Sequence, residues 1–305
     1  MDEIKEKKAK PQVGGQALIE GVMMRSENDV SMAVRLKNKK IDVESFKITF
    51  LEKIKWYRKI PLLRGIIEMI ASLVIGYKCL LKSAQKVELE EEKKEEKEEK
   101  ENKKLLTILS TLAALFGVFL TIILFMFLPS LAVKQTAKIF KFNNFFKVLI
   151  EGIIKITIFI SYIFITSKLP DVKRTFEYHG AEHKTIACFE ADLNLTVENV
   201  KKQTRFHPRC GTNFIFIVLM ISILVFSFLT WKNLIVRLIL KFFTLPIVTG
   251  ISYEVIRLAG KNSNLLAKIL IAPGLLLQRL TTKEPDDSQI EIAITSLKEV
   301  IKDKI

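Results

Sequence analysis

LLTILSTLAALFGVFLTIILFMFL, residues 105–128, contains no charged side chain and limits the fold more than any other stretch of the sequence. As a helix it is long enough to cross the hydrocarbon core of a bilayer, which is about 30 Å thick. Two more segments are long and apolar enough to span: Asn213–Trp231, which is also uncharged, and Val148–Thr166. Glu151 and Lys155 in the last one are spaced i,i+4 and can neutralise each other. The sequence therefore predicts three clear membrane spans.

A fourth span is predicted at Leu234–Ile256, although it carries Arg237, Lys241 and Glu254. Charged side chains near the ends of a membrane helix can extend toward the lipid headgroups. The expected fold class is thus a mainly α-helical membrane protein with about four transmembrane helices. Its 49% hydrophobic residues, combined with 27% charged residues and a mean hydropathy of +0.25, agree with long apolar runs between polar flanks.

The flanks of the spans predict the orientation. With four spans, the N-terminus, the segment containing the histidines and the C-terminus lie on one side. That side holds Lys103, Lys104, Lys168, Lys173, Arg174, Arg205, Arg209, Arg257 and Lys261. The positive-inside rule makes it the cytoplasm, and a bacterial cytoplasmic (inner) membrane is the expected location. Lys134, Lys138, Lys141 and Lys147 would face the other side and argue against this orientation.

The formal net charge of +15 indicates a partner of opposite charge. In a membrane protein this charge favours a bilayer containing anionic lipids, and no specific nucleic acid is predicted. No cleavable signal sequence is expected, because the first apolar segment follows a long polar N-terminus. Cys79, Cys188 and Cys210 are odd in number and widely spaced, which favours reduced thiols over a disulfide framework.

The polar regions divide the rest of the chain. Short β-like segments from Val13 to Phe50 predict a small cytoplasmic sheet. Pro61–Lys82 is too interrupted by charges to span, and predicts an interfacial helix. Leu265–Leu280, broken by Pro273-Gly274, predicts a second surface segment. The predicted units are 1–60 (β-rich), 61–104 (interfacial helix and charged linker), 105–166 (first transmembrane hairpin), 167–212 (His/Cys loop), 213–258 (second hairpin) and 259–305 (surface segment and amphipathic C-terminal helix).

The three histidines all fall between residues 179 and 207, and two of them frame the pentad His179-Gly180-Ala181-Glu182-His183. This H-x-x-E-H pattern is an inverted zinc-peptidase motif. Imidazoles four residues apart lie one helical turn from each other, so both can face one metal ion. Glu182 beside them is the candidate general base.

The remaining ligands are open at this level. In a catalytic site, Glu254 is the candidate third ligand and Glu190 the nearer alternative, with one position left for water. In a closed structural site, His207 and Cys210 complete a four-ligand set with the two histidines. A third interpretation is that the histidines only form hydrogen bonds in a polar segment without metal.

Five segments of the chain resemble the YqhQ-like family of bacterial membrane proteins. They are GGQALIEGVMMR (14–25), YHGAEHKTIACFE (178–190), HPRCGTNF (207–214), ISYEVIRLAG (251–260) and APGLLLQRLTTKEPDD (272–287). The resemblance implies a membrane location and a metal-dependent enzyme without naming a reaction. It marks Gly14, Gly15, Glu20, Gly21, Arg25, His179, Glu182, His183, His207, Arg209, Cys210, Gly211, Glu254 and Arg257 as residues of the family's motifs.

The sequence thus predicts a zinc-dependent membrane hydrolase that acts on a peptide or a membrane protein near the bilayer surface. The alternative is a non-enzymatic membrane scaffold or assembly factor, with a structural metal or with none. The two hypotheses differ in what they require of Glu182.

Overall fold

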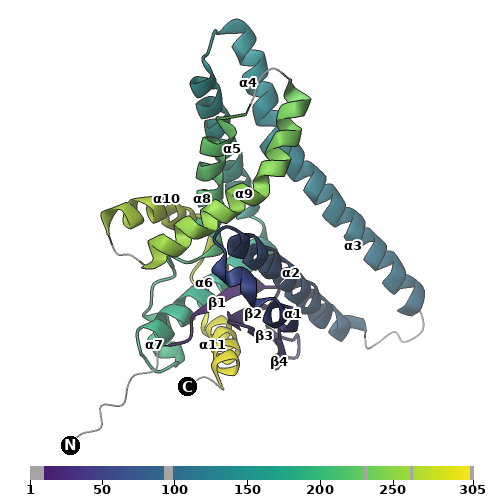
Figure 1. Cartoon of the computed structure of the whole chain (residues 1–305). Helices are drawn as coiled ribbons and strands as arrows, with labels where there is room; N and C mark the ends of the chain where they lie inside the picture. The colour runs from purple at the N-terminus through teal and green to yellow at the C-terminus, as the bar shows by residue number, and fades with distance from the viewer. Residues whose placement is uncertain (1–9, 93–98, 230–232, 262–263, 303–305) are drawn as a thin grey trace, which may run out of the picture.

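A computed structural model of the chain describes residues 10–92, 99–229, 233–261 and 264–302. It has two parts: a small sheet with helices on both faces, and a group of long helices that extends away from it (Figure 1). The predicted class is confirmed in its main features, since the chain is mainly helical with a small N-terminal sheet.

The sheet is an antiparallel meander in the order β1-β2-β3-β4, formed by Val13–Leu18, Gly21–Ser26, Asp29–Arg35 and Ile41–Lys47. Its tight turns contain Glu20, Glu27 and Lys39 with φ of 51°, 54° and 65°. The turn between β1 and β2 lies within the segment Ala17–Met23. Glu20 adopts the left-handed backbone that this turn needs, and its carboxylate is held by Arg174 and by the Tyr178 hydroxyl.

Each face of the sheet is covered by helices from distant parts of the sequence. Alternate side chains such as Met23 and Met32 pack on Ala71 and Ile75 of α2 (Leu63–Glu92). The opposite face packs against α6 (Pro170–Glu190) and α11 (Asp287–Ile301). The predicted β-rich unit 1–60 therefore contributes the strands of a larger folded unit, whose core requires α2, α6 and α11.

The long helices form the second part. They are α3 (Glu99–Ile122), a π-helical turn (Ile123–Phe127), α4 (Leu128–Ile139), α5 (Asn144–Thr166), α8 (Gly211–Phe226) and α9 (Leu234–Lys261). Three helical segments among the described residues are long and apolar enough to cross a membrane: Thr111–Ile139, Asn144–Thr166 and Leu234–Ala259. The helix in the predicted span Asn213–Trp231 is α8, which has 16 residues, and residues 230–232 lie outside the described chain.

Two prolines lie inside helical segments, one of them at the Pro273-Gly274 break expected from the sequence. The first apolar helix continues beyond residue 128, through Pro129 to Ile139. Pro129 occupies the first turn of α4, after the π-helical turn, where a missing N–H costs little. Likewise α10 (Leu265–Thr281) continues through Pro273. Its Gly274 lies against Asn213, whose Oδ1 would be 2.1 Å from an added Cβ.

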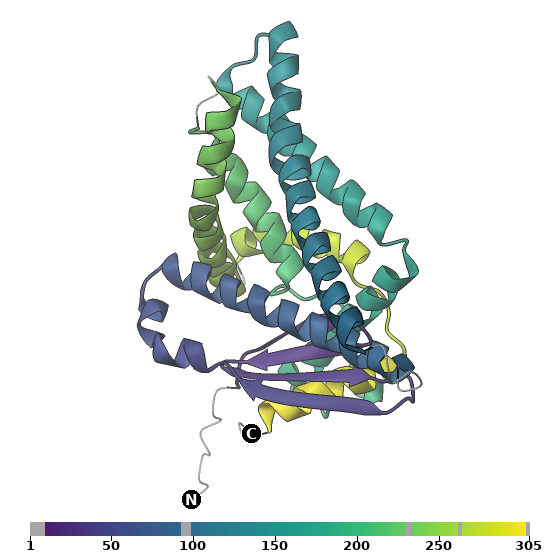
Figure 2. The same cartoon turned by 90° about the vertical axis from the view of Figure 1, so that its right-hand side faces the viewer.

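Helices α2 and α10 lie across the base of the long helices, with α2 between them and the sheet (Figure 2). Exposed apolar side chains follow helical spacing on both helices: Ile70, Leu73 and Val74 on α2, and Leu266, Ile269 and Leu270 on α10. Both segments are helical, and their position at a membrane surface stays a prediction. The charged linker is helical on both sides of residues 93–98, since α2 extends to Glu92 and α3 begins at Glu99. Residues 93–98 lie outside the described part.

Short helices complete the chain: α1 (Thr49–Lys53), a 3-10 helix (Lys55–Lys59) and α7 (Val197–Lys201). The C-terminal helix α11 begins with a capping box formed by Asp286 and Gln289. Its predicted stripe, Ile290, Ile294, Leu297 and Ile301, is buried against the sheet and α6. The tail is therefore an integral layer of the sheet unit.

We expect Leu297→Ala to destabilise the sheet unit by about 2–5 kcal/mol, because truncating a fully buried leucine loses its transfer free energy and leaves a cavity. The change in the free energy of unfolding is measured by denaturant titration of the purified protein in detergent, followed by intrinsic fluorescence of the sheet unit. The exposed neighbour Lys298 is the matched control, and Lys298→Ala should stay within about 0.5 kcal/mol of wild type. Equal effects of the two substitutions would contradict a packed α11.

Candidate metal centre

His179 and His183 lie one turn apart on α6, with ring centroids 4.4 Å from each other. The helix contains Gly180 between them, where an added Cβ would be 2.0 Å from the carbonyl oxygen of Lys283. The backbone after α10 therefore passes directly over this turn, and only glycine leaves room for it. The helix tolerates the lower helical propensity of Gly180 because the close packing requires it.

Cys210 lies close to the two histidines. It is the N-cap residue of α8, and its sulfur accepts a hydrogen bond from the Thr212 amide at 3.4 Å. His179 Nε2 is 3.2 Å from Cys210 Sγ. One ligand atom from each of His179, His183 and Cys210 lies within 4.8 Å of the other two. Among the described residues this is the group of histidine, cysteine and acidic side chains that could hold a metal ion.

Backbone carbonyls orient both imidazoles. Nδ1 of His179 is 2.9 Å from the Thr281 carbonyl oxygen, and Nδ1 of His183 is 2.6 Å from that of Arg205. A carbonyl can only accept, so Nδ1 carries the proton in each ring and Nε2 keeps its lone pair. Metal-binding histidines commonly have this outer hydrogen bond. Nε2 of His183 is buried without a hydrogen-bond partner, and burial lowers the pKa of this imidazole, which favours the neutral form that can bind metal.

Glu182 projects beside the cluster and is buried. Its Oε2 is 4.0 Å from His179 Nε2. Burial raises the pKa of the Glu182 carboxyl, while His179, His207 and the backbone N–H of Gly15 act in the opposite direction. Gly15 in β1 is in tight contact with this side chain, since a Cβ there would be 2.8 Å from Glu182 Cγ. The first strand therefore positions the carboxylate next to the histidines.

His207 lies next to the cluster, with its ring centroid 5.7 Å from that of His183. Its Nε2 is 3.4 Å from Glu190 Oε2, and Glu190 also pairs with Arg209. The closed four-ligand set predicted from the sequence is thus brought together for His179, His183 and Cys210, whereas His207 pairs with a carboxylate. Glu190, the alternative third ligand, is likewise engaged in this second group.

Glu254 lies outside the cluster. Its carboxylate forms a two-pronged ion pair with Arg64 of α2, with Nε 2.6 Å from Oε1, and Arg257 is 3.7 Å away. Both carboxylate oxygens are thereby engaged by arginine. The structure therefore places Glu254, the expected third ligand, away from the histidines: it joins α9 to α2, whereas Cys210 lies beside His179.

A buried amide network, which sequence reasoning missed, holds the segment that carries His207 and Cys210. Gln278 of α10 accepts from the His207 amide and donates to its carbonyl, both at 2.8 Å. It also donates to Asn213, whose own amide bonds to the Pro208 carbonyl at 2.6 Å. The available signal was the presence of polar Gln278 and Asn213 within otherwise apolar stretches.

A cavity of about 470 Å³ lies next to the centre, between β1, α2 and α9. Its wall includes Gly15, which contacts Glu182, and Arg209, which precedes Cys210. Arg25 and Glu68, an ion pair at 2.9 Å, line the opposite part with Tyr253 of α9. The cavity is thus separated from Glu182 by Gly15, and it reaches the long helices at Tyr253.

Comparisons with known proteins identify relatives of the whole chain. The family described as protein of unknown function (DUF1385) matches residues 60–303. The chain is also 37% identical over 299 residues to the uncharacterized protein YqhQ of Bacillus subtilis (strain 168), which covers 97% of this chain and 94% of that protein. No solved structure matches. The resemblance in the five sequence motifs is thereby confirmed, and the chain belongs to the YqhQ-like family of proteins of unknown function, DUF1385.

Proposed function

We propose that this protein is a zinc-dependent hydrolase of the bacterial cytoplasmic membrane, with His179, His183 and Cys210 as metal ligands and Glu182 as general base. The observation that carries the proposal is the set of three ligand atoms within 4.8 Å, with both Nδ1 atoms already bound to backbone carbonyls. Because these hydrogen bonds use Nδ1, both Nε2 atoms are available to one metal ion.

The donor chemistry favours zinc. Imidazole nitrogen and thiolate are ligands that Zn²⁺ accepts in tetrahedral sites, and three protein ligands leave a fourth position for water. A divalent cation would also balance the Cys210 thiolate and the buried Glu182 carboxylate, whose charges are costly to bury alone. At such a centre, zinc would supply an activated water and polarise the carbonyl to be cleaved.

The roles of the protein groups follow from their positions. Glu182 would take a proton from the attacking water, which its raised pKa favours, and would then pass that proton to the leaving group. The Gly15 amide would hold the carboxylate in place, and the adjoining cavity would receive the substrate. Because the cavity is bounded by β1 and by α9, the substrate we propose is a peptide segment of a membrane protein at the bilayer surface.

The proposed topology has four membrane-crossing helices, with α8 as the short fourth member, and places the sheet unit and both chain ends in the cytoplasm. The basic residues that flank the spans on this side support it. Helices α2 and α10 would then lie in the headgroup region, where anionic lipids attract the basic protein surface.

A scaffold or assembly factor with a structural metal is the second candidate. One observation favours it: the ligands come from α6 and from the start of α8, and His179 is bonded to Thr281 at the end of α10. A metal ion would therefore join the sheet unit to the long helices. Such an ion would need no base, so Glu182 separates the two candidates.

We expect about one zinc ion per purified chain, and a loss of roughly tenfold or more in His183→Ala and Cys210→Ala, because each substitution removes one of three ligands. Elemental mass spectrometry after chelator-free purification measures the metal content. Glu254→Gln is the control, since Glu254 pairs with Arg64 away from the cluster, and it should retain wild-type zinc. Absence of metal from wild type, or loss in Glu254→Gln alone, would refute the assigned ligands.

We expect Glu182→Gln to keep zinc and thermal stability but to abolish hydrolysis, with at least a hundredfold loss of rate, because glutamine cannot accept the proton. Mass spectrometry of new peptide termini in membranes of cells producing either form provides the readout, and it detects cleavage in any membrane protein.

Two glycine variants serve as matched controls for the Glu182 experiment. Gly15→Ala should also lose activity, because its Cβ collides with Glu182, whereas an added Cβ at Gly14 meets nothing within 4 Å and Gly14→Ala should remain active. If cells with Glu182→Gln produce the same termini as wild type, the hydrolase is excluded and the scaffold becomes the better hypothesis.

A further inference from the structure

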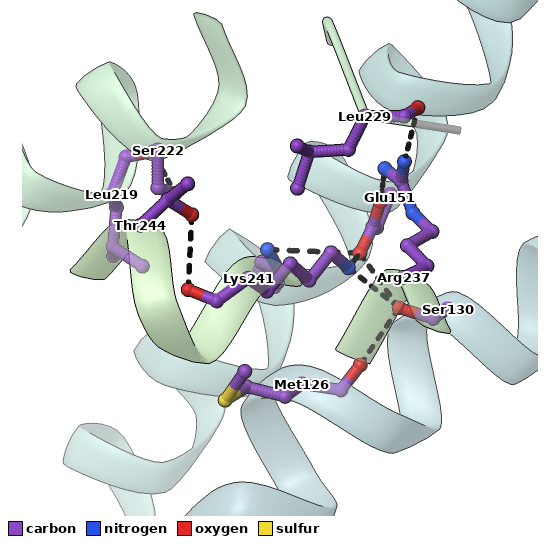
Figure 3. Close-up of polar contacts among 10 residues, drawn as sticks. Met126, Ser130, Glu151, Leu219, Ser222, Leu229, Arg237, Lys241 and Thr244 are labelled. Atoms are coloured by element: carbon purple, nitrogen blue, oxygen red, sulfur yellow. Dashed lines mark hydrogen bonds and ion pairs between the residues drawn. The ribbon is translucent and has the colours of Figure 1, made fainter. Parts of the chain in front are cut away.

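A group of charged side chains lies buried between the long helices, at the end away from the sheet (Figures 1 and 3). Glu151 and Lys155 come from α5, and Arg237 and Lys241 from α9. The exposed fractions of these side chains are 2%, 5%, 0% and 0% in that order. Ionisable groups within a membrane-spanning region are costly and usually mark a ligand or ion site.

All three cations converge on the same carboxylate. Arg237 Nη2 donates to Glu151 Oε2 at 2.8 Å, and Lys241 pairs with Oε1 (Figure 3). Lys155 Nζ lies 3.7 Å from the same Oε1. Ser130 of α4 completes the group, since its hydroxyl is 2.9 Å from Glu151 Oε1 and accepts from Lys241 at 2.6 Å. Each carboxylate oxygen is thus already engaged.

With Lys155, Arg237 and Lys241 all protonated, the group carries two positive charges in excess. One carboxylate cannot neutralise three cations, and Glu151 is the only acidic residue of the sequence within 105–170 and 211–253. Phe226 gives partial compensation, because Lys155 and Lys241 lie 4.7 Å and 5.5 Å from its ring centroid. A ring quadrupole does not replace a counterion, and buried charges in proteins are normally paired.

The surroundings add to the positive charge. Lys241 and Glu151 each lie seven residues from the first residue of their helix, or about 10 Å along the axis. Lys141 lies in the connection between α4 and α5, and Lys147 lies in the first turn of α5, at the same end of these helices. These two lysines oppose the predicted orientation if their function is topological. Near a buried cationic group they would instead attract an anion.

We propose that this end of the helix bundle binds an oxyanion of the phosphate class against Lys155, Arg237 and Lys241. Guanidinium and ammonium groups together are the usual partners of phosphate oxygens. The oxyanion is either the headgroup of an anionic phospholipid or free inorganic phosphate, and both would balance the excess charge. The site lies at the end of the long helices away from the candidate metal centre and does not depend on the hydrolase proposal.

The test uses the full-length protein purified in mild detergent. Phospholipid retained through purification is identified by mass spectrometry after solvent extraction. In parallel, the Tm of delipidated protein is followed while inorganic phosphate replaces chloride at constant ionic strength, and again in nanodiscs containing phosphatidylglycerol or phosphatidylcholine alone. A headgroup site predicts about one retained anionic lipid and a Tm increase only with phosphatidylglycerol, whereas a free-anion site predicts saturable stabilisation by phosphate.

Lys155→Met removes one excess charge and leaves Glu151 paired with Arg237 and Lys241, so the helices should still assemble. We expect its apparent affinity for the stabilising anion to fall at least tenfold, and Lys155→Arg to restore it. Lys138→Met, which removes an exposed lysine of α4, is the matched control and should bind as wild type. Comparison with this variant also corrects for the general stabilising effect that phosphate has as a salt.

The proposal is overturned if wild type retains no anionic lipid and shows no saturable response to phosphate or to phosphatidylglycerol. It is equally overturned if Lys155→Met and Lys138→Met respond alike. Either result would make the charged group a structural ion-pair network. Since no step of the experiment measures hydrolysis or zinc, its failure would leave the proposed function of the metal centre untouched.

Discussion

The structure depends on burying both faces of a four-stranded sheet. A sheet with apolar side chains on alternate faces needs a cover on each side, and the chain supplies these covers from three distant segments. Helix α2 covers one face, and α6 and α11 cover the other. Because the predicted membrane spans lie between these segments in the sequence, closing the sheet unit also fixes where the long helices enter and leave it. The candidate metal centre, His179, His183 and Cys210, lies where these two parts meet.

The geometry of the candidate metal centre depends on backbone segments that lie close to α6. The backbone after α10 passes over Gly180, and β1 lies against Glu182 at Gly15. These contacts place two backbone carbonyls at the outer nitrogens of the histidines and one amide at the carboxylate. The backbone of three separate segments consequently orients the side chains of the centre independently of any metal. A side chain at either glycine would displace the groups on which the proposed chemistry relies.

Unusual charge is found near both ends of the long helices, with opposite sign. At the sheet end, donor atoms of neutral or negative groups gather around a space suited to a cation. At the other end, three cations surround a single carboxylate. In both places burial makes an unbalanced charge expensive, so the same electrostatic reasoning predicts a cation in one and an anion in the other. The interior between them is largely apolar helix, which keeps the two groups independent.

Elements whose signal is local could be predicted from the sequence. Period-two alternation predicted the sheet, helical spacing predicted the buried stripe of α11, and apolar length predicted the long helices. The spacing of His179 and His183 predicted that both rings share one face, since four residues make about one helical turn. The family followed from five ordered motifs, which no single local pattern could have established.

The long-range contacts of the candidate site were decided only by the tertiary structure, because they depend on which segments pack together. Glu254 is adjacent to no arginine in sequence except Arg257, yet folding brings Arg64 to it and removes it from the ligand set. Cys210 becomes the third member of the cluster because the start of α8 docks beside α6. Pro129 lies in the first turn of α4, where its missing N–H costs little, and α10 continues through Pro273. Sequence spacing determines which face a side chain shares, whereas packing across hundreds of residues determines what that face meets.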